Sequence, residues 1–336
     1  MEQFCMRIFC TLFDSNYLDK GLALYDSLYQ FNDDFKLYVF AFDRTTFEIL
    51  IDMKLSNMKV IGIEEFETDE LRKIKNERSR AEYCWTCTPL TIEYVLQKFN
   101  EDQCTYLDAD IYFFSSPEVL FNEIKGSSNS VIITEHRFPA DVREKLLAVS
   151  GKYCVQFNTF NNEKNSIEIL NWWKNRCLEN CSYSKSGEQM GDQQYLQNWT
   201  TIFNGVHELQ HLGGGMAPWN IRQYSLIDKS NYIFSYNNSN FQLVFYHFQN
   251  IRYLPFGFVN IHSGTSDTRK KQTIYIPYLI HIEKLRKMLN KTYGVSFLAQ
   301  KSTYKNPVLK FIQKYIMPFK IMNFSDIISL KKLRNL

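Results

Sequence analysis

The stretch Tyr106-Leu107-Asp108-Ala109-Asp110-Ile111-Tyr112-Phe113 joins two apolar runs through an Asp-x-Asp pair. The residues just before the pair, 104–107, have the length and apolar character of a buried strand that ends at the first carboxylate. In open α/β sheets, ligands bind at the carboxyl ends of the strands. The sequence therefore predicts that Asp108 and Asp110 lie at a ligand-binding edge of a sheet.

The chain around this stretch alternates between strand and helix patterns. Residues 18–31, for example, place Leu18, Leu22 and Leu28 at helical spacing. Such alternation predicts a mostly parallel sheet with helices on both faces. The predicted strands are residues 4–12, 35–42, 59–63, 104–107, 131–134, 153–160 and 241–248. The predicted helices are residues 18–31, 46–53, 68–80, 89–99 (with Pro89 in the first turn) and 166–178.

No internal repeat and no low-complexity linker divides the chain, so we predict one domain over residues 1–300 in two halves, 1–125 and 126–300. Residues 301–336 differ, because they hold eight Lys and Arg against Asp326 alone. Apolar residues mix with these Lys at helical spacing and are interrupted by Pro318. This basic amphipathic segment has two interpretations: it lies in a membrane interface, or it packs on the body as a C-terminal helix.

Composition narrows the class of protein. The 336 residues are 45% hydrophobic and 22% charged, which is ordinary for a globular protein. The net charge of +3 comes from the basic tail, and residues 1–300 are mildly acidic, which argues against a general nucleic-acid binder. Met1-Glu2-Gln3 lacks the basic start of a signal peptide. We therefore predict a cytoplasmic protein with reduced thiols, peripheral on the inner face of the membrane if the tail binds there.

The Asp-x-Asp pair suggests a cation site. Carboxylates at i and i+2, where a strand gives way to a turn, can converge on one hard cation, and Mg²⁺ or Mn²⁺ commonly takes one or two carboxylates together with substrate phosphates. The alternative is that Asp108 and Asp110 are turn or helix-capping residues. His247 ends a strand-like run far along the chain and is the candidate third ligand, with a structural histidine as the alternative.

Two polar segments are further candidates. Gly191-Asp192-Gln193-Gln194 opens a helix after a polar loop, so Asp192 and Gln193 either hydrogen-bond sugar hydroxyls or cap the helix. Gly213-Gly214-Gly215 leads to Trp219. Glycines let the backbone approach a ligand closely and an indole can stack on a sugar, whereas a plain turn held down by Trp219 is the alternative.

With these segments in order, the chain resembles the GT-A fold glycosyltransferases, and in particular glycosyltransferase family 8, over residues 5–255. The matching segments are Cys10-Thr11-Leu12-Phe13-Asp14-Ser15-Asn16-Tyr17 before a helix, residues 106–110, Gln156-Phe157-Asn158-Thr159, Asp192-Gln193 and His247. The chain is also similar to a group of bacterial glycosyltransferases with Glu-Tyr-Cys-Trp-Thr, Gly-Asp-Gln-x-Tyr-Leu and Ala-Pro-Trp-Asn segments, here residues 82–86, 191–196 and 217–220. The implied fold is a Rossmann-like mixed sheet flanked by helices, with a C-terminal helical extension.

The resemblance implies a role for each matching residue. Residues 1–125 would bind the nucleotide, with Tyr17 stacked on the base, and residues 126–300 would bind the donor sugar and the acceptor. The implied metal ligands are Asp108, Asp110 and His247, for Mn²⁺ or Mg²⁺. The implied residues at the donor sugar and the reaction centre are Asn158, Asp192 and Gln193. The implied contacts to the nucleotide-sugar are Thr11, Asp14, Asn16, Tyr17, Arg80, Asp108, Trp219 and Arg252.

The chain departs from family 8 at three places. The Gly that the family has in an Asn-Ser-Gly segment is absent, since Phe160 follows Thr159. An Arg that the family carries before the Asp-x-Asp motif is replaced near Trp85, and Arg80 is the candidate substitute. The late His is usually followed by Gly and Lys, where this chain has Asn250 and Tyr253. Arg252 is the candidate for the missing charge, because a guanidinium is well suited to a diphosphate.

The predicted reaction is the divalent-metal-dependent transfer of a sugar from a nucleotide-diphosphate sugar, a UDP-sugar, to a glycan or lipid-linked acceptor in polysaccharide biosynthesis. No inverting base stands out, which favours retention of configuration. One alternative is a nucleotidyltransferase that makes a nucleotide-sugar, but residues 12–17 lack the Gly-rich loop that such enzymes carry. The other is a non-catalytic carbohydrate-binding protein of the same fold.

Overall fold

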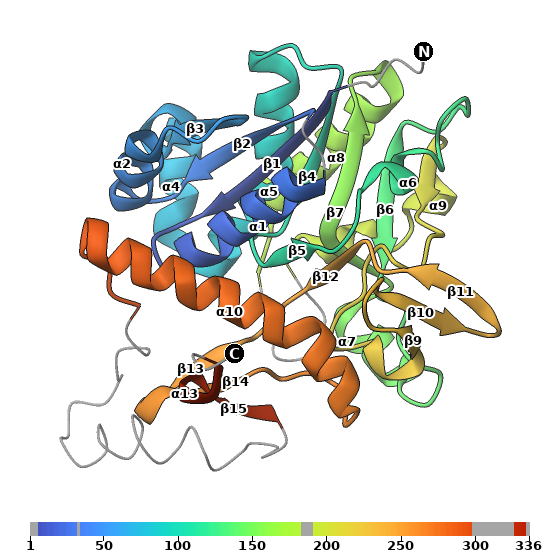
Figure 1. The fold of residues 1–336 in the computed structure, drawn as a ribbon. Coiled ribbons are helices and arrows are strands. Elements are labelled where there is room, and N and C mark those ends of the chain that lie inside the picture. The colour runs from blue at the N-terminus through green and yellow to red at the C-terminus, as the bar shows by residue number, and fades with distance from the viewer. Residues whose placement is uncertain (1–5, 32–33, 183–190, 298–325, 334–336) are drawn as a thin grey trace. The chain divides into compact units, whose positions relative to one another are not determined.

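The computed structural model describes residues 6–31, 34–182, 191–297 and 326–333 (Figure 1). Contacts between residues divide the chain into two compact units. Unit 1 comprises residues 1–216 and 241–247, and unit 2 comprises residues 217–240 and 248–336. The predicted domain over residues 1–300, with its halves 1–125 and 126–300, stays a prediction beside this division.

Unit 1 is built on a seven-stranded mixed sheet. Its strands are β1 (Arg7–Phe13), β2 (Phe35–Ala41), β3 (Met58–Gly62), β4 (Gln103–Leu107), β6 (Val131–Glu135), β7 (Tyr153–Asn161) and β8 (Val206–Glu208). They are ordered β3-β2-β1-β4-β7-β6-β8. Four of the six neighbouring pairs are parallel, and β7 is antiparallel to both β4 and β6. The predicted α/β fold, a mixed sheet flanked by helices, is confirmed.

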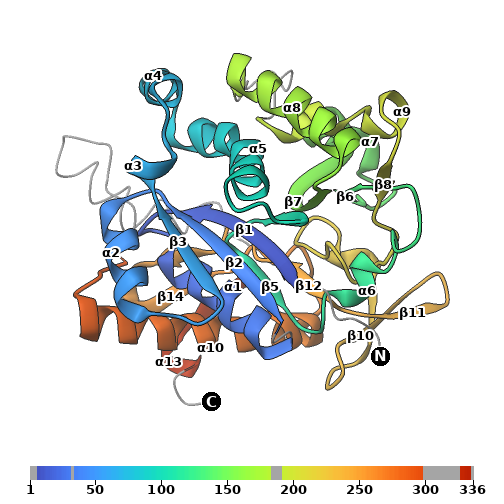
Figure 2. The same cartoon turned by 90° about the horizontal axis from the view of Figure 1, so that it is seen from above.

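Helices lie on both faces of this sheet: α5 and α8 are on one side and α1 is on the other (Figure 2). Apolar residues of α5 and α8, such as Ile92 and Trp173, pack with strand residues such as Tyr38 and Tyr106 in one core. The helices of unit 1 are α1 (Leu18–Phe31), α2 (Arg44–Met53), α3 (Ile63–Phe66), α4 (Asp69–Glu77), α5 (Arg80–Lys98), α6 (Glu118–Phe121), α7 (Arg143–Ser150), α8 (Lys164–Glu179) and α9 (Trp199–Ile202).

One predicted helix starts at the wrong place. Pro89 was expected in a first turn, but α5 begins at Arg80 and contains Pro89 in its interior. The hydroxyl of Ser79 accepts the N–H of Glu82, and the Glu82 carboxylate accepts the N–H of Ser79. This capping box satisfies backbone donors that a helix start leaves free, so the helix starts there.

The predicted strand at residues 241–248 is also wrong in part, because it is two strands: β11 (Ser239–Gln242) and β12 (Phe245–His247). β11 belongs to a sheet with β10, whereas β12 pairs antiparallel with β5 (Ile111–Phe113), with His247 opposite Ile111 (Figure 1). β5 follows the Asp-x-Asp pair directly. This two-stranded ribbon therefore brings His247 to the end of β4.

Unit 2 contains two antiparallel arrangements and one long helix. β9 (Ser225–Asp228) pairs with β10 (Ile233–Tyr236). β14 (Phe258–Asn260) lies between β13 (Arg252–Leu254) and β15 (Ile327–Ser329). The long helix is α10 (Thr268–Tyr293), and α13 (Leu330–Leu333) follows β15. Buried Asp326, just before β15, accepts from Lys271 Nζ at 2.7 Å and from the Ser263 hydroxyl at 2.6 Å, which ties this end of the chain to α10.

The predicted amphipathic segment, residues 301–336, is described only over residues 326–333, which form β15 and α13. The rest of that prediction lies outside the described residues. Within the part of the chain that the structure covers, no helix combines the length and the apolar character needed to cross a membrane.

Candidate metal and donor-sugar site

Asp108 and Asp110 occupy the turn between β4 and β5. All five residues of β4 are buried, so the strand runs through the core and places the carboxylates at its carboxyl end. The N–H of Asp108 donates to the backbone oxygen of Gln156 on β7 at 3.2 Å, and the N–H of Ile111 donates to the backbone oxygen of Asp108 at 3.1 Å. One hydrogen bond to β7 and one within the turn therefore hold the backbone of the Asp-x-Asp pair in place.

His247 meets both carboxylates. Its Nε2 lies 3.0 Å from Asp110 Oδ1 and 3.7 Å from Asp108 Oδ2. Its other ring nitrogen, Nδ1, donates to Gln156 Oε1 at 3.0 Å. The Tyr106 hydroxyl donates to Asp108 Oδ1 at 3.2 Å. The three predicted metal ligands thus converge, although they come from distant parts of the sequence.

The charges in this cluster shift one another's protonation. Burial raises the pKa of Asp108 to about 7, and the Asp110 carboxylate adds to that rise. Burial also opposes ionisation of Asp110, but His247 and the Lys20 ammonium, 3.9 Å away, lower the pKa of Asp110 to about 2. Burial lowers the pKa of His247, and the two carboxylates more than offset it, so the net shift is upward. Without a cation, His247 and Lys20 balance the charge of Asp110.

The donor set fits a hard divalent cation. Two ligands at right angles and about 2.1 Å from one ion lie about 3.0 Å apart, which is close to the separation of His247 Nε2 and Asp110 Oδ1. A metal-binding histidine usually donates its other ring N–H to a neighbour, as His247 does to Gln156. Over the described ranges, no group of three or more His, Cys, Asp or Glu side chains is placed so that it could hold a metal ion. A cation at this place would therefore need these side chains to move and further oxygen ligands from a substrate.

The predicted nucleoside residues gather in the turn between β1 and α1. Asp14 Oδ1 accepts the N–H of Asn16 at 2.8 Å, and Arg80 at the start of α5 forms an ion pair with the same carboxylate. Tyr17 as a whole residue is 42% exposed, which is compatible with stacking of its ring on a base. Lys20 Nζ lies 3.7 Å from the centre of that ring.

Lys20 was not predicted from the sequence. It contacts Tyr17 and also lies near Asp110, so it links the nucleoside turn to the carboxylates. Its spacing of i+3 from Tyr17 at the start of a helix was the available signal, because residues at that spacing share a helix face.

Several buried polar groups on the sheet and in the loop at Asp192 have no hydrogen-bond partner. Both amide atoms of Asn158 are unpaired, as are Gln156 Nε2, Asp192 Oδ2 and the Thr11 hydroxyl, among the residues that the structure describes. Each of these residues is at most 8% exposed. Unpaired buried polar groups are costly and uncommon, so such a group of atoms indicates a place where a polar ligand binds.

Asp192 is held by contacts with two helices. Trp173 Nε1 of α8 donates to the backbone oxygen of Asp192 at 3.1 Å, and the nearby Thr88 hydroxyl of α5 acts to lower the pKa of the Asp192 carboxyl. Gly191 has a φ of +62°, and a Cβ there would come within 2.7 Å of the Trp85 indole. Burial and the nearby Asp108 charge raise the pKa of Asp192 to about 8. The Glu-Tyr-Cys-Trp-Thr and Gly-Asp-Gln segments therefore meet in space.

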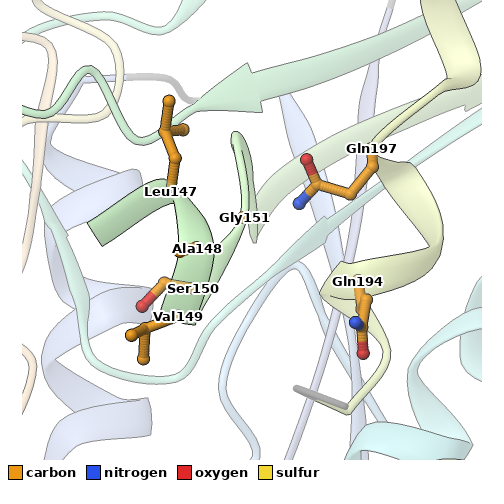
Figure 3. Close-up of a pocket in the computed structure, with 7 residues that line it drawn as sticks. All are labelled: Leu147, Ala148, Val149, Ser150, Gly151, Gln194 and Gln197. Atoms are coloured by element: carbon orange, nitrogen blue, oxygen red, sulfur yellow. The ribbon is translucent and has the colours of Figure 1, made fainter. Parts of the chain in front are cut away.

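Gln193 points elsewhere. Its Nε2 donates to the backbone oxygen of Ser150, at the end of α7, at 2.9 Å. A pocket of about 120 Å³ lies beside this contact (Figure 3). The residues lining it are Leu147, Ala148, Val149, Ser150, Gly151, Gln194 and Gln197. Gln193 therefore lies next to Asp192 in sequence but bonds the α7 segment.

The remaining predicted residues, Trp219 and Arg252, belong to unit 2, and their roles stay predictions. Arg252 Nε donates to Asn250 Oδ1 at 2.9 Å. Asn250, at the position where the family that the sequence resembles has glycine, has a φ of +66°. Asn is among the few residues that enter this left-handed region readily, so the replacement preserves the backbone conformation that glycine would provide. In unit 1, a Cβ on Gly213 would come within 1.9 Å of the Gln242 backbone oxygen, so packing requires that glycine.

Comparison with known proteins gives partial matches. No protein-family model matches the chain. The uncharacterized protein YfnF of Bacillus subtilis (strain 168) is 28% identical over 283 residues, which cover 82% of this chain and 92% of YfnF. The uncharacterized protein YfnD of the same strain is 28% identical over 281 residues, covering 82% of this chain and 88% of YfnD.

Solved structures also overlap this chain in part. The galactosyltransferase LgtC, solved with donor and acceptor sugar analogs, has a TM-score of 0.40 at 15% identity and covers 60% of this chain and 72% of its own. Mouse xyloside xylosyltransferase 1 has a TM-score of 0.43 at 12% identity, with 72% and 97% covered. The glycosyltransferase GlyE of Streptococcus pneumoniae TIGR4 has 0.45 at 12% identity, with 89% and 66% covered. We therefore base the proposed function on the geometry of the site.

Proposed function

We propose that this chain is a divalent-cation-dependent glycosyltransferase that moves a sugar from a UDP-sugar to a glycan or lipid-linked acceptor. The observation that carries the proposal is the convergence of Asp108, Asp110 and His247 at the carboxyl end of β4. Buried, unpaired polar atoms of Asn158 and Asp192 belong to the same unit. The candidate cation ligands suit a diphosphate, and the unpaired polar atoms suit sugar hydroxyls. A nucleotide-diphosphate sugar has both.

The nucleoside would bind at the turn between β1 and α1. Tyr17 offers an exposed ring for stacking on the base, and stacking of this kind is worth about 1–3 kcal/mol per base. Asp14 and Arg80 form an ion pair beside Tyr17, and they offer a carboxylate acceptor and guanidinium donors. The Asn16 N–H already bonds Asp14, which fixes the shape of the turn before any ligand arrives.

The diphosphate would bind next to Asp108, Asp110 and His247, which would hold Mn²⁺ or Mg²⁺. Such a cation supplies positive charge to the leaving diphosphate, and stabilisation of developing charge is usually a large part of catalysis. Lys20 adds a second positive charge on the nucleoside side of Asp110. Arg252 stays the predicted further source of positive charge.

The sugar would be held by the unpaired polar atoms. Asn158 can both donate and accept, and Asp192 offers a carboxylate oxygen, so together they can bond adjacent hydroxyls. The hydrogen bond from Trp173 holds the backbone of Asp192 in place, which favours a fixed sugar orientation. We propose retention of configuration, which product analysis by NMR of the anomeric proton tests directly.

Hydrolysis of UDP-sugars is the functional test. A panel of UDP-sugars with Mn²⁺ should give slow release of UDP from at least one donor, and Asp110→Ala should abolish it. Turnover that is unchanged in Asp110→Ala would refute the assigned site. A chain that binds a UDP-sugar but neither hydrolyses nor transfers it would be a carbohydrate-binding protein of the same fold.

A further inference from the structure

Gln156 on β7 contacts both segments that carry the proposed cation ligands. Its backbone oxygen accepts the N–H of Asp108 at 3.2 Å, and its side-chain Oε1 accepts the Nδ1–H of His247 at 3.0 Å. Gln156 is 0% exposed and His247 is 5% exposed, so water does not compete for this hydrogen bond. A side-chain amide that is buried this completely needs a hydrogen-bond partner, and His247 supplies it.

We propose that Gln156 is a positioning residue for the cation, and this inference rests on the proposed function. Its Oε1 holds His247 as the Nδ1–H tautomer, which leaves the Nε2 lone pair facing Asp108 and Asp110. A neutral imidazole has a single N–H, so the partner of one nitrogen decides whether the other can bind a metal. In this role Gln156 acts on the cation through His247.

The backbone of His247 is already fixed, which leaves the ring as the variable part. The N–H of His247 donates to the Met216 backbone oxygen at 2.9 Å, and β12 is paired with β5. Rotation of the imidazole about its side-chain bonds is the remaining freedom. Gln156 restrains that rotation, and it also selects the nitrogen that faces the carboxylates.

Two substitutions at Gln156 separate this role from a merely structural one. Gln156→Met keeps the length of the side chain and removes the acceptor. Gln156→Glu keeps an acceptor at the same reach. The matched control is Thr159→Val on the same strand, which removes a buried hydrogen bond of 2.8 Å to Thr105 and leaves the cation ligands untouched.

The measurement is the affinity for Mn²⁺ alone, from the EPR signal of the free ion in the full-length protein at one fixed pH above neutrality. Pulsed EPR adds the nitrogen modulation that a directly bound imidazole produces. Outer partners of metal-binding histidines typically change metal affinity by about 10–100-fold. We expect a loss of that size and a weaker nitrogen modulation in Gln156→Met, and near wild-type behaviour in Gln156→Glu and Thr159→Val.

Wild-type Mn²⁺ affinity and nitrogen modulation in Gln156→Met would overturn the proposal. So would a folded Gln156→Glu that loses as much as Gln156→Met, because the acceptor would then not be the cause. If Gln156→Glu does not fold, the comparison of Gln156→Met with Thr159→Val still decides. Asp110→Ala separates the two levels: if it loses Mn²⁺ and Gln156→Met does not, only the positioning role fails, whereas wild-type Mn²⁺ binding by Asp110→Ala removes the cation site itself.

Discussion

Replacing Asp110 by Asn keeps the shape of the side chain and removes its charge. In the folded chain the pKa of Asp110 is about 2, against an ordinary value of 3.8. That difference corresponds to roughly 2 kcal/mol of stabilisation of the ionised form. Because the folded pKa is the lower one, this stabilisation is complete above pH 3.8 and is lost as the pH falls toward 2. At neutral pH the substitution therefore removes all of it.

We expect two effects in thermal unfolding of Asp110→Asn. Without metal, the free energy of unfolding falls by about 2 kcal/mol, which lowers Tm by a few degrees. With Mn²⁺, the wild type gains about 2.7 kcal/mol at a concentration one hundred times Kd, and the variant gains little. The control is Glu118→Gln, which breaks the ion pair with Arg7 at 2.8 Å and should leave the Mn²⁺ response intact. The reasoning fails if Mn²⁺ stabilises Asp110→Asn as much as the wild type.

Three further predictions concern other parts of the chain. Gly191→Ala should lower the free energy of unfolding in chemical denaturation by about 1–3 kcal/mol more than Gly126→Ala does, because both glycines have positive φ but only Gly191 also packs against Trp85. Equal losses in the two variants would contradict the packing argument. Burial lowers the pKa of His136 from 6.5 to about 4, so protonation of His136 should lower the free energy of unfolding by up to about 3 kcal/mol as the pH falls through that range. His136→Gln should make the free energy of unfolding less dependent on pH there, and an unchanged slope would exclude this role of His136. Changing the four Lys of residues 305–320 to Gln should weaken binding to anionic vesicles by about 1 kcal/mol per Lys in a sedimentation assay, and equal binding would refute a membrane role for the tail.

Local patterns predicted the framework of the fold well. The helix at residues 18–31 was predicted over its full length, because its apolar residues follow the helical period without interruption. The start of α5 differs from the prediction, because Pro89 is typical of a first turn and competes as a signal with the capping box of Ser79 and Glu82. The strand at residues 241–248 was predicted as continuous because an apolar run does not show where a chain leaves one sheet for another.

The site depended on information that local patterns do not contain. His247 meets Asp110 because β12 pairs with β5, and nothing in either segment encodes that pairing. The sequence pattern made His247 and Asp192 candidates, each with a structural alternative, and the resemblance to a known family favoured their roles in a site. Gln156 and Lys20 were missed: Gln156 stands between apolar neighbours in a strand, where a polar side chain signals a buried partner, and Lys20 follows Tyr17 on one helix face.

The most direct test of the central claim is calorimetric titration of the full-length protein with UDP in the presence and absence of Mn²⁺. A nucleotide-diphosphate site that shares its cation with Asp108, Asp110 and His247 requires coupled binding, and coupling between two ligands is typically 5–150-fold in affinity. The account predicts that UDP binds about tenfold or more tightly with Mn²⁺ than without it. Equal affinity under both conditions, or no binding of UDP when Mn²⁺ is present, would contradict it.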